Sequence, residues 1–212
     1  MNEDGTMRAV DDGERIELPE PSRTGTVSLE ETMARRRSQR AFAADPLALE
    51  TIGQLAWSAQ GVTEAATGYR TAPSAGGTLP IEVDLLVHGL PDLGDGVYRY
   101  LPSEHALRRR LSGDLTEAVT QATLNQGFVR EAPVVMVLSA VAARTAPRFG
   151  ALTDRLIDME VGHAAQNVSL QAVALDLGTV VVAAIREAEL SAVLQLAEGE
   201  RPIYLMPLGR PR

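Results

Sequence analysis

The longest hydrophobic pattern of the chain covers residues 154–177 and has the period of a helix. Its apolar positions recur every three or four residues, and fifteen residues without a charge follow Glu160. A helix with so few charges is buried on nearly all sides, so its polar side chains need partners inside the fold or at a subunit interface. Gly162, Ala164 and Ala165 leave room for another helix to approach closely. We therefore predict one long central helix.

Shorter patterns predict further helices and strands around it. Ser28 and Glu31 have the spacing of a capping box and should open a short helix. Alternating apolar and polar residues predict half-buried strands, and continuous apolar runs predict strands buried on both faces. A loop rich in Gly, Pro and hydroxyl groups is expected over residues 62–80. We predict helices over residues 28–37, 46–61, 115–124 and 187–196, and strands over residues 82–88, 97–100, 133–141, 179–185 and 203–208.

This order of elements predicts an α+β or mixed α/β sandwich of three layers. A Rossmann domain is not expected, because no G-x-G-x-x-G turn follows a strand. Residues 1–27 are rich in acidic residues, Gly and Pro, and read as a mobile arm or an extended segment that embraces a neighbour. Residues 28–212 are predicted to form a single domain.

Composition removes several classes of function. The net charge of −8 argues against a nucleic-acid-binding surface, although Arg35–Arg37 and Arg108–Arg110 could hold small anions locally. No apolar run has membrane-spanning length, so we expect a cytoplasmic protein. The chain has no Cys and no Lys, which excludes thiolate chemistry, a Schiff-base enzyme and a Walker P-loop. Its three His residues are scattered, and we predict no metal site.

Four polar segments are not required by folding alone. They are Arg36–Arg40, Arg70–Gly77, Ala183–Ile185 and Gly209–Arg210. Arginine binds phosphate through two parallel hydrogen bonds, and adjacent hydroxyls complete an anion site. Such segments around an apolar core would suit a ligand with an anionic end, a polyhydroxy middle and a flat aromatic head, which is the anatomy of flavin mononucleotide (FMN). The alternative is that these arginines are ordinary solvated surface.

Six motifs in the chain resemble those of one family. The chain is similar to the nitroreductase family of flavoenzymes, and in particular to its SagB-type dehydrogenase branch, which includes oxidases that convert peptide azolines to azoles. The resemblance covers residues 28–211. Its motifs are R-R-S-x-R-x-F from Arg36, P-L-x-L-E-x-x-x-x-L-x-W-x-A-Q-G from Pro46, R-T-A-P-S-A-G-G from Arg70, G-V-Y-x-Y from Gly96, E-x-G-H-A-A-Q-N from Glu160 and P-x-G-R-P from Pro207.

The resemblance implies a three-layer nitroreductase-like sandwich with a mixed, mainly antiparallel sheet, and a homodimer with two FMN sites built from both chains. Arg40 would face the N1 and O2 edge of the flavin ring and favour its reduced, anionic form. The remaining assignments are Arg36, Arg37 and Ser38 for the phosphate and ribityl chain, Pro73, Ser74, Ala75 and Gly76 of the partner subunit beside the ring, Ala183, Ala184 and Ile185 past N5, and Arg210 at the phosphate.

One departure from the branch limits the choice of reaction. Azoline-oxidising members of the branch carry a Lys-Tyr pair before the long helix, and this chain has Arg148 and Phe149 there. Neither can take the proton that azoline aromatisation releases. The chain could be an NAD(P)H-dependent reductase of a small compound or a dehydrogenase of a small or peptide-derived substrate. The alternatives are an azoline oxidase and a catalytically silent flavoprotein in a modification complex.

Overall fold

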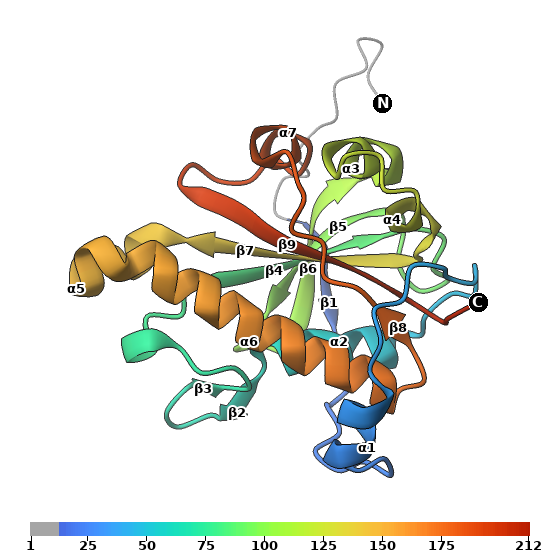
Figure 1. Ribbon diagram of the computed structural model, residues 1–212, viewed down its shortest axis with the longest axis horizontal. Coiled ribbons are helices and arrows are strands. Elements are labelled where there is room, and N and C mark those ends of the chain that lie inside the picture. The colour runs from blue at the N-terminus through green and yellow to red at the C-terminus, as the bar shows by residue number, and fades with distance from the viewer. Residues whose placement is uncertain (1–12) are drawn as a thin grey trace.

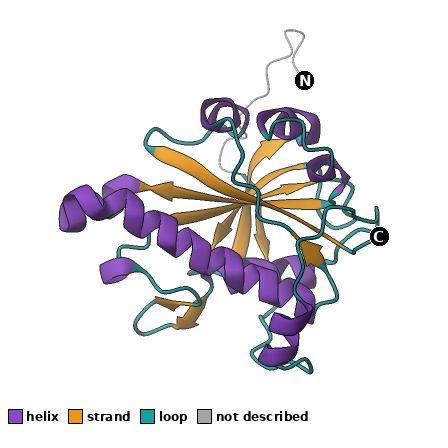
Figure 2. Ribbon diagram, viewed as in Figure 1, coloured by secondary structure: helices purple, strands orange, loops and turns teal. Residues whose placement is uncertain are grey.

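The computed structural model describes residues 13–212 and places one sheet between two layers of helices (Figure 1, Figure 2). Seven strands follow the order β1-β6-β5-β4-β7-β9-β8, and all neighbours pair antiparallel. The α+β fold and its mainly antiparallel sheet are therefore as predicted. The elements are β1 Arg15–Glu17, α1 Leu29–Arg35, α2 Leu49–Gln60, β2 Val62–Glu64, β3 Tyr69–Arg70, a 3-10 turn η1 Ala75–Gly77, β4 Ile81–Val87, β5 Gly96–Leu101, β6 Ala106–Ser112, α3 Thr116–Ala122, α4 Phe128–Glu131, β7 Val134–Val141, η2 Ala142–Arg144, α5 Ala146–Phe149, η3 Gly150–Leu152, α6 Thr153–Ala174, β8 Gly178–Thr179, α7 Glu187–Val193 and β9 Glu200–Gly209.

Each face of the sheet has its own hydrophobic core. Helices α2 and α6 cover one face, where Leu55 and Val161 are buried together with Met136 of β7. Helices α3, α4 and α7 cover the other face, where Val119 and Leu190 are buried. Burying apolar side chains on both faces is what makes β7, the continuously apolar strand, central in the sheet.

The helices begin and end close to the predicted positions. Helix α1 starts after Ser28, whose hydroxyl accepts a hydrogen bond from the backbone N–H of Glu31 at 3.1 Å, as the capping box predicts. Helix α2 begins at Leu49, three residues later than expected from Pro46, because Ala48 has extended backbone angles at its N-cap. Helix α6, with 22 residues from Thr153 to Ala174, corresponds to the predicted central helix and ends three residues before its predicted end.

The sequence pattern does not predict strand β6, because Arg108, Arg109 and Arg110 interrupt its alternation. In the fold two of these charges have partners on other strands. Arg109 donates from Nε to the Tyr98 hydroxyl at 2.9 Å, and Arg110 donates from Nη1 to buried Asp84 at 2.8 Å. Two of the three arginines suggested as an anion site are thus engaged within the sheet.

The predicted arm contributes to the sheet of its own chain. Residues 15–17 form edge strand β1, which pairs with β6 and places Ile16 opposite Leu107. Leu18, the next residue, is buried in the core below α2 and donates its N–H to the carbonyl of His105 at 3.1 Å. At least this part of residues 1–27 is therefore an element of the domain, while residues 1–12 lie outside the described residues.

The prediction of a buried strand over residues 179–185 is wrong beyond Thr179. After β8, only Val182 forms a bridge, with Leu205. Val180 and Val182 are buried, whereas Val181 is 39% exposed. The apolar run therefore lies at the edge of the sheet and is buried on one face only. The prediction failed because a run without polar residues does not distinguish burial on one face from burial on both.

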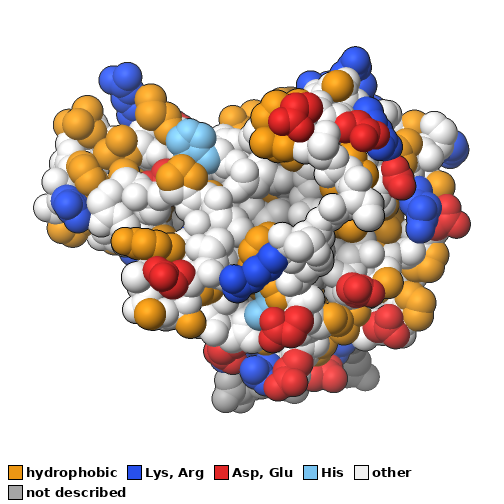
Figure 3. All heavy atoms as spheres, turned by 90° about the horizontal axis from the view of Figure 1, so that it is seen from below, with side chains coloured by type: hydrophobic (Ala, Val, Ile, Leu, Met, Phe, Trp, Pro, Cys, Tyr) orange, Lys and Arg blue, Asp and Glu red, His pale blue; other side chains and the backbone are white. Residues whose placement is uncertain are grey.

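Helix α6 is covered on only one side by its own chain. Val161, Ala164, Ala165 and Val168 are buried against the sheet and α2, and Met159 on the other side is 47% exposed. The space-filling view shows hydrophobic side chains gathered at the end of the molecule where α5 and the start of α6 lie (Figure 3). The expectation of burial on nearly all sides is therefore not met within one chain. Among the described helices, none is long and apolar enough to cross a membrane.

Candidate functional site

Three segments that are far apart in the sequence run side by side near the C-terminal end of α6. The N–H of Gln39 donates to the carbonyl of Thr179 at 3.0 Å, and the N–H of Ala43 donates to the carbonyl of Arg210 at 2.9 Å. Ser38 forms a parallel bridge with Thr179. These backbone bonds bring two of the four predicted polar segments, Arg36–Arg40 and Gly209–Arg210, together with β8 (Figure 1).

The arginine cluster, formed by Arg36, Arg37, Arg40 and Arg210, lies on these segments. Arg35, just before it, is paired with two carboxylates. Arg37 donates from Nη1 to the carbonyl of Arg36 at 2.7 Å, which holds it against the end of α1. The side chains of Arg36, Arg40 and Arg210 make no hydrogen bond or ion pair within residues 13–212. Unpaired cations gathered in an acidic chain are suited to an anionic ligand.

The backbone around the arginine cluster is closely packed and leaves one polar atom unused. The hydroxyl of Thr179 is buried and has no hydrogen-bond partner among the described residues. A Cβ added to Gly178 would lie 2.6 Å from Cγ of Gln39, so only glycine lets these two segments approach. A buried unpaired hydroxyl costs free energy, and a bound polar group can satisfy it.

The third predicted segment follows β8 along the outer edge of the sheet. Ala183 and Ala184 are exposed, and Ile185 is half-buried. The carbonyl of Ala184 accepts a weak hydrogen bond from Nε2 of Gln126 at 3.4 Å. The N–H groups of Ala183 and Ala184 have no acceptor within residues 13–212, so this piece of backbone can donate to a ligand.

The loop of residues 73–76 lies elsewhere and is fixed to α6. The N–H of Ala75 donates to a carboxylate oxygen of Glu160 at 2.6 Å, and Nδ2 of Asn167 donates to the carbonyl of Thr71 at 3.0 Å. Within the loop, the hydroxyl of Ser74 accepts a hydrogen bond from the backbone N–H five residues further on, at 2.9 Å. Side chains of the long helix thus determine the conformation of this loop.

Helix α5 holds the tip of the same loop from the other side. Arg148 donates from Nη1 to the carbonyl of Gly76 at 2.8 Å, and the hydroxyls of Thr145 and Thr78 are 2.9 Å apart. A Cβ at Gly76, which has a φ of 58°, would lie 2.7 Å from Cζ of Arg148. The glycine therefore permits both the left-handed backbone and the close contact with the guanidinium.

One chain does not bring the loop and the arginine cluster together. The loop is attached to α6 at Glu160, and the cluster lies beyond its last residue, Ala174. Fourteen residues of helix at about 1.5 Å per residue separate these points by ~21 Å. The arginine cluster with Ala183–Ile185 and the loop of residues 73–76 are therefore two separate halves of the predicted site.

Glu160 gives the loop a pH-dependent attachment. Burial raises the pKa of Glu160, against the lowering effect of the hydrogen bonds from Ala75 and Ser74. A carboxyl with a raised pKa contributes stability that is present at low pH and is lost as the pH rises through the folded-state pKa. We expect Glu160→Gln, which keeps an oxygen for Ala75, to gain stability relative to the wild type as the pH rises from about 4 to 7. Thermal unfolding across this range measures the difference, and a constant difference would contradict it.

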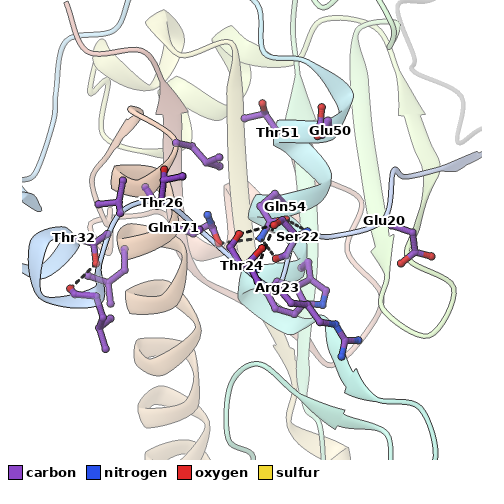
Figure 4. A pocket seen from close by; sticks show the side chains of 17 residues that line it. Glu20, Ser22, Arg23, Thr24, Thr26, Thr32, Glu50, Thr51, Gln54 and Gln171 are labelled. Atoms are coloured by element: carbon purple, nitrogen blue, oxygen red, sulfur yellow. Dashed lines mark hydrogen bonds between the residues drawn. The ribbon is translucent and has the colours of Figure 1, made fainter.

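A cavity of ≈ 690 Å³ lies between residues 20–29, α2 and the last turns of α6 (Figure 4). Gln54 stands at its centre, where its Nε2 donates to the Ser22 carbonyl and to Oε1 of Gln171, both at 3.1 Å. None of the predicted site residues lines it. In the sequence, only the hydroxyl-rich stretch around Ser22 indicates this cavity. A second cavity of ≈ 240 Å³ includes Arg37 and therefore adjoins the arginine cluster.

Three further polar side chains meet where β4, β5 and β6 end or begin. Ligand atoms of His88, Asp95 and Asp114 lie within 4.8 Å of one another. Asp95 accepts hydrogen bonds from the N–H of Gly89 at 2.9 Å, and Asp114 accepts from the N–H of Thr116 at 2.8 Å. These bonds stabilise two turns, and this structural role explains why carboxylates stand at both positions. That the protein has no metal site stays a prediction.

Known proteins are similar to this chain in both sequence and fold. The model of the nitroreductase family matches residues 33–210. A provisionally named nitroreductase of Methanocaldococcus jannaschii is 37% identical over 92% of this chain and 96% of its own length. The crystal structure of a provisionally named nitroreductase from Ralstonia eutropha JMP134 is 32% identical, with a TM-score of 0.84 over 98% of this chain and 95% of that one.

Two more distant structures show the same fold alone. The NADPH:FMN oxidoreductase of Vibrio harveyi, complexed with NAD+, has a TM-score of 0.62 at 20% identity, covering 86% of this chain and 68% of that one. The microcin synthetase McbBCD of E. coli, with truncated pro-MccB17 bound, has a TM-score of 0.74 at 22% identity, covering 92% and 76%.

The fold and these relatives define the protein as an oxidoreductase. The chain belongs to the nitroreductase family, whose members are flavoproteins that commonly use FMN. The predicted family and enzyme class are therefore confirmed. The residues present fit such a cofactor. Arg36, Arg40, Arg210, the hydroxyl of Thr179 and the N–H groups of Ala183 and Ala184 have no partner in the described part of the chain, so they can donate to a phosphate and to a flat, hydrogen-bonding ring.

Proposed function

We propose that the protein is an FMN-dependent oxidoreductase that acts as a homodimer, with each of two sites built from both chains. The observation that carries this proposal is the arginine cluster, where three side chains have no partner in residues 13–212 of an acidic chain. FMN, when bound, supplies the N5 position that accepts and donates a hydride. All other steps depend on how the protein binds, orients and shields the reactants.

The residues of the arginine cluster divide between the two ends of the cofactor. Arg36, Arg37 and Arg210, with the hydroxyl of Ser38, bind the phosphate and the ribityl chain, because guanidinium groups match phosphate oxygens in pairs. Arg40 holds a positive charge at the N1 and O2 edge of the ring, where negative charge increases on reduction. Keeping this charge in place before the reaction lowers the barrier to hydride uptake.

The other residues border the ring. The backbone of Ala183, Ala184 and Ile185 passes the N5 side and offers the N–H groups that have no acceptor within residues 13–212. Pro73, Ser74, Ala75 and Gly76 of the partner subunit lie beside the ring from the opposite direction. The ~21 Å between the two halves in one chain supports this assignment, because one chain alone leaves the ring uncovered on one side.

The partner subunit also accounts for the exposed side of α6. Leu152 is 53% exposed and Met159 is 47% exposed, one on the turn before α6 and one on the helix itself. A dimer interface of more than ~2,000 Å² would cover this apolar surface. A C2 arrangement places the same surface of both chains in contact, so the exposed side of α6 in one chain would cover the same side in the other.

The direction of hydride transfer separates an NAD(P)H-dependent reductase from a dehydrogenase of a small or peptide-derived substrate. We favour the reductase, because Arg148 and Phe149 supply no proton acceptor of the kind that azoline oxidation requires. Rapid anaerobic bleaching of the flavin by NAD(P)H supports the reductase. Slow bleaching together with oxygen-dependent turnover of a peptide or an amine supports the dehydrogenase.

The purified protein is expected to be yellow and to release FMN when it is denatured. Arg40→Ala should keep its FMN but take up the hydride at least about tenfold more slowly, because it removes the charge at the ring edge. Stopped-flow absorbance at the flavin band measures the rate.

Arg108→Ala is the matched control. Arg108 is also an exposed arginine without an ion pair among the described residues, but it lies on β6, outside the proposed site. A colourless protein that gains no flavin absorbance with excess FMN would overturn the proposed function. Equal rates in Arg40→Ala and the wild type at full FMN occupancy would contradict only the position of Arg40.

A further inference from the structure

We propose that Arg148 binds an oxyanion, a carboxylate or a phosphate, carried by a reactant of the enzyme and thereby gives the site a preference for anionic reactants. This inference deepens the proposed function and rests on it for the position of the loop of residues 73–76 beside the flavin. No contact with the cofactor is required of Arg148 itself.

The guanidinium of Arg148 is held in a defined place. Its Nη1 donates to the carbonyl of Gly76 at 2.8 Å, and its Cζ lies 5.6 Å from the ring centroid of Phe149. The helix that carries it is fixed to the loop by Thr145 and Thr78, and Arg144 donates to the carbonyl of Leu79 at 3.0 Å. A side chain fixed in this way loses less conformational freedom on binding a ligand than a free surface arginine.

Most of the hydrogen-bonding capacity of Arg148 remains unused. A guanidinium has five N–H groups in a planar fork, and the bond to Gly76 uses one of them. Within residues 13–212, Arg148 has no carboxylate partner. The carboxylates around the loop are already engaged, because Glu160 accepts from Ala75 and Glu82 pairs with Arg144 and Arg99. The positive charge of Arg148 is therefore available to a ligand.

The surroundings indicate what kind of anion fits. Phe149 is half-buried beside the guanidinium and offers an apolar surface. A planar carboxylate on an aromatic ring could bind the fork of the guanidinium and contact Phe149 at the same time. The second source of an oxyanion is the extra phosphate that distinguishes NADPH from NADH. Both belong to reactants, since the phosphate of FMN is assigned to the arginine cluster.

The test compares two pairs of reactants in which one member carries an additional anionic group. Steady-state kinetics with 4-nitrobenzoate and with neutral 4-nitrobenzyl alcohol, and with NADPH and NADH, are measured for the wild type, Arg148→Gln and Arg148→Lys. We expect Arg148→Gln to raise KM for the member of one pair that carries the additional anionic group, and so to lower its kcat/KM by roughly tenfold relative to the other member of that pair. Arg148→Lys should fall between, because a lysine keeps the charge but not the fork. The affected pair identifies the source of the oxyanion.

A control and a binding measurement complete the test. Arg108→Gln removes the same charge from β6 and is expected to change neither ratio. Benzoate and NADP+ are also titrated into the holoenzyme and followed by ligand-observed NMR, which does not depend on turnover. Equal affinities of wild type and Arg148→Gln for both probes, with unchanged ratios of kcat/KM, would overturn this inference. A wild type that gains no flavin absorbance with excess FMN would instead contradict the proposed function, and absence of NAD(P)H-dependent reduction of a bound flavin would contradict only the preference for a reductase.

Discussion

Met159→Glu is expected to give a soluble monomer that retains no FMN. Met159 is 47% exposed on the side of α6 that its own chain leaves uncovered, so the substitution should not disturb the core. In a C2 dimer the new carboxylate would appear twice in one apolar interface, where a charge without a partner costs several kcal/mol. Light scattering after size-exclusion chromatography, with absorbance at the flavin band, measures both effects.

Met159→Leu is the control, because it changes shape slightly and adds no charge. A dimer of Met159→Glu with its full complement of FMN would show that α6 does not form the interface. Ala165→Glu would not distinguish these outcomes, although Ala165 lies in the stretch first predicted to face another helix. It is only 2% exposed and belongs to the core between α6 and the sheet, so a glutamate there should unfold each chain.

Asp84→Ala is expected to destabilise the protein by about 3–5 kcal/mol. Asp84 is fully buried on β4 and accepts hydrogen bonds from Nε and Nη2 of Arg99 at 2.6 and 2.8 Å, and from Nη1 of Arg110 at 2.8 Å. Although burial acts in the opposite direction, the hydrogen bonds and charge of Asp84 raise the pKa of Arg99. Removing the carboxylate leaves two poorly solvated guanidinium groups without their main partner. Urea unfolding followed by circular dichroism measures the loss.

Asp84→Asn should lose less, because an amide oxygen still accepts one of these bonds. The control is Glu117→Ala, which breaks an ion pair with Arg130 in which both side chains are 60% exposed. Pairs of this kind contribute between about 0 and 1 kcal/mol. If Asp84→Ala and Glu117→Ala had equal effects, the buried ion pairs would not contribute to the stability of the sheet.

The elements that could be predicted from the sequence are those determined by local pattern. Helix α6 follows from a helical period over 22 residues, and the start of α1 follows from a cap that Ser28 forms with the next turn. Strand β6 could not be predicted, because its central charges are compensated by Asp84 and Tyr98 from two other strands. Partners that far away in the sequence have no signature in a local pattern.

In the candidate site, too, local features could be predicted and long-range contacts could not. Arg36–Arg40 and Arg210 could be named from their chemistry and from the family resemblance, but the backbone bond between Ala43 and Arg210 that brings them together spans most of the chain. The contact of Arg148 with Gly76 was also unforeseen, since 72 residues separate them. The residue types indicate a ligand, while the fold alone determines which residues meet.

The distance along α6 between the two halves of the site has a thermodynamic consequence. When a ligand binds only to an arrangement that two chains form together, ligand binding and chain association are linked equilibria. The apparent affinity for FMN should then rise with protein concentration until every chain is associated, and FMN should strengthen association by the same factor. Dilution of the enzyme would thus remove its cofactor without any change in the concentration of free FMN.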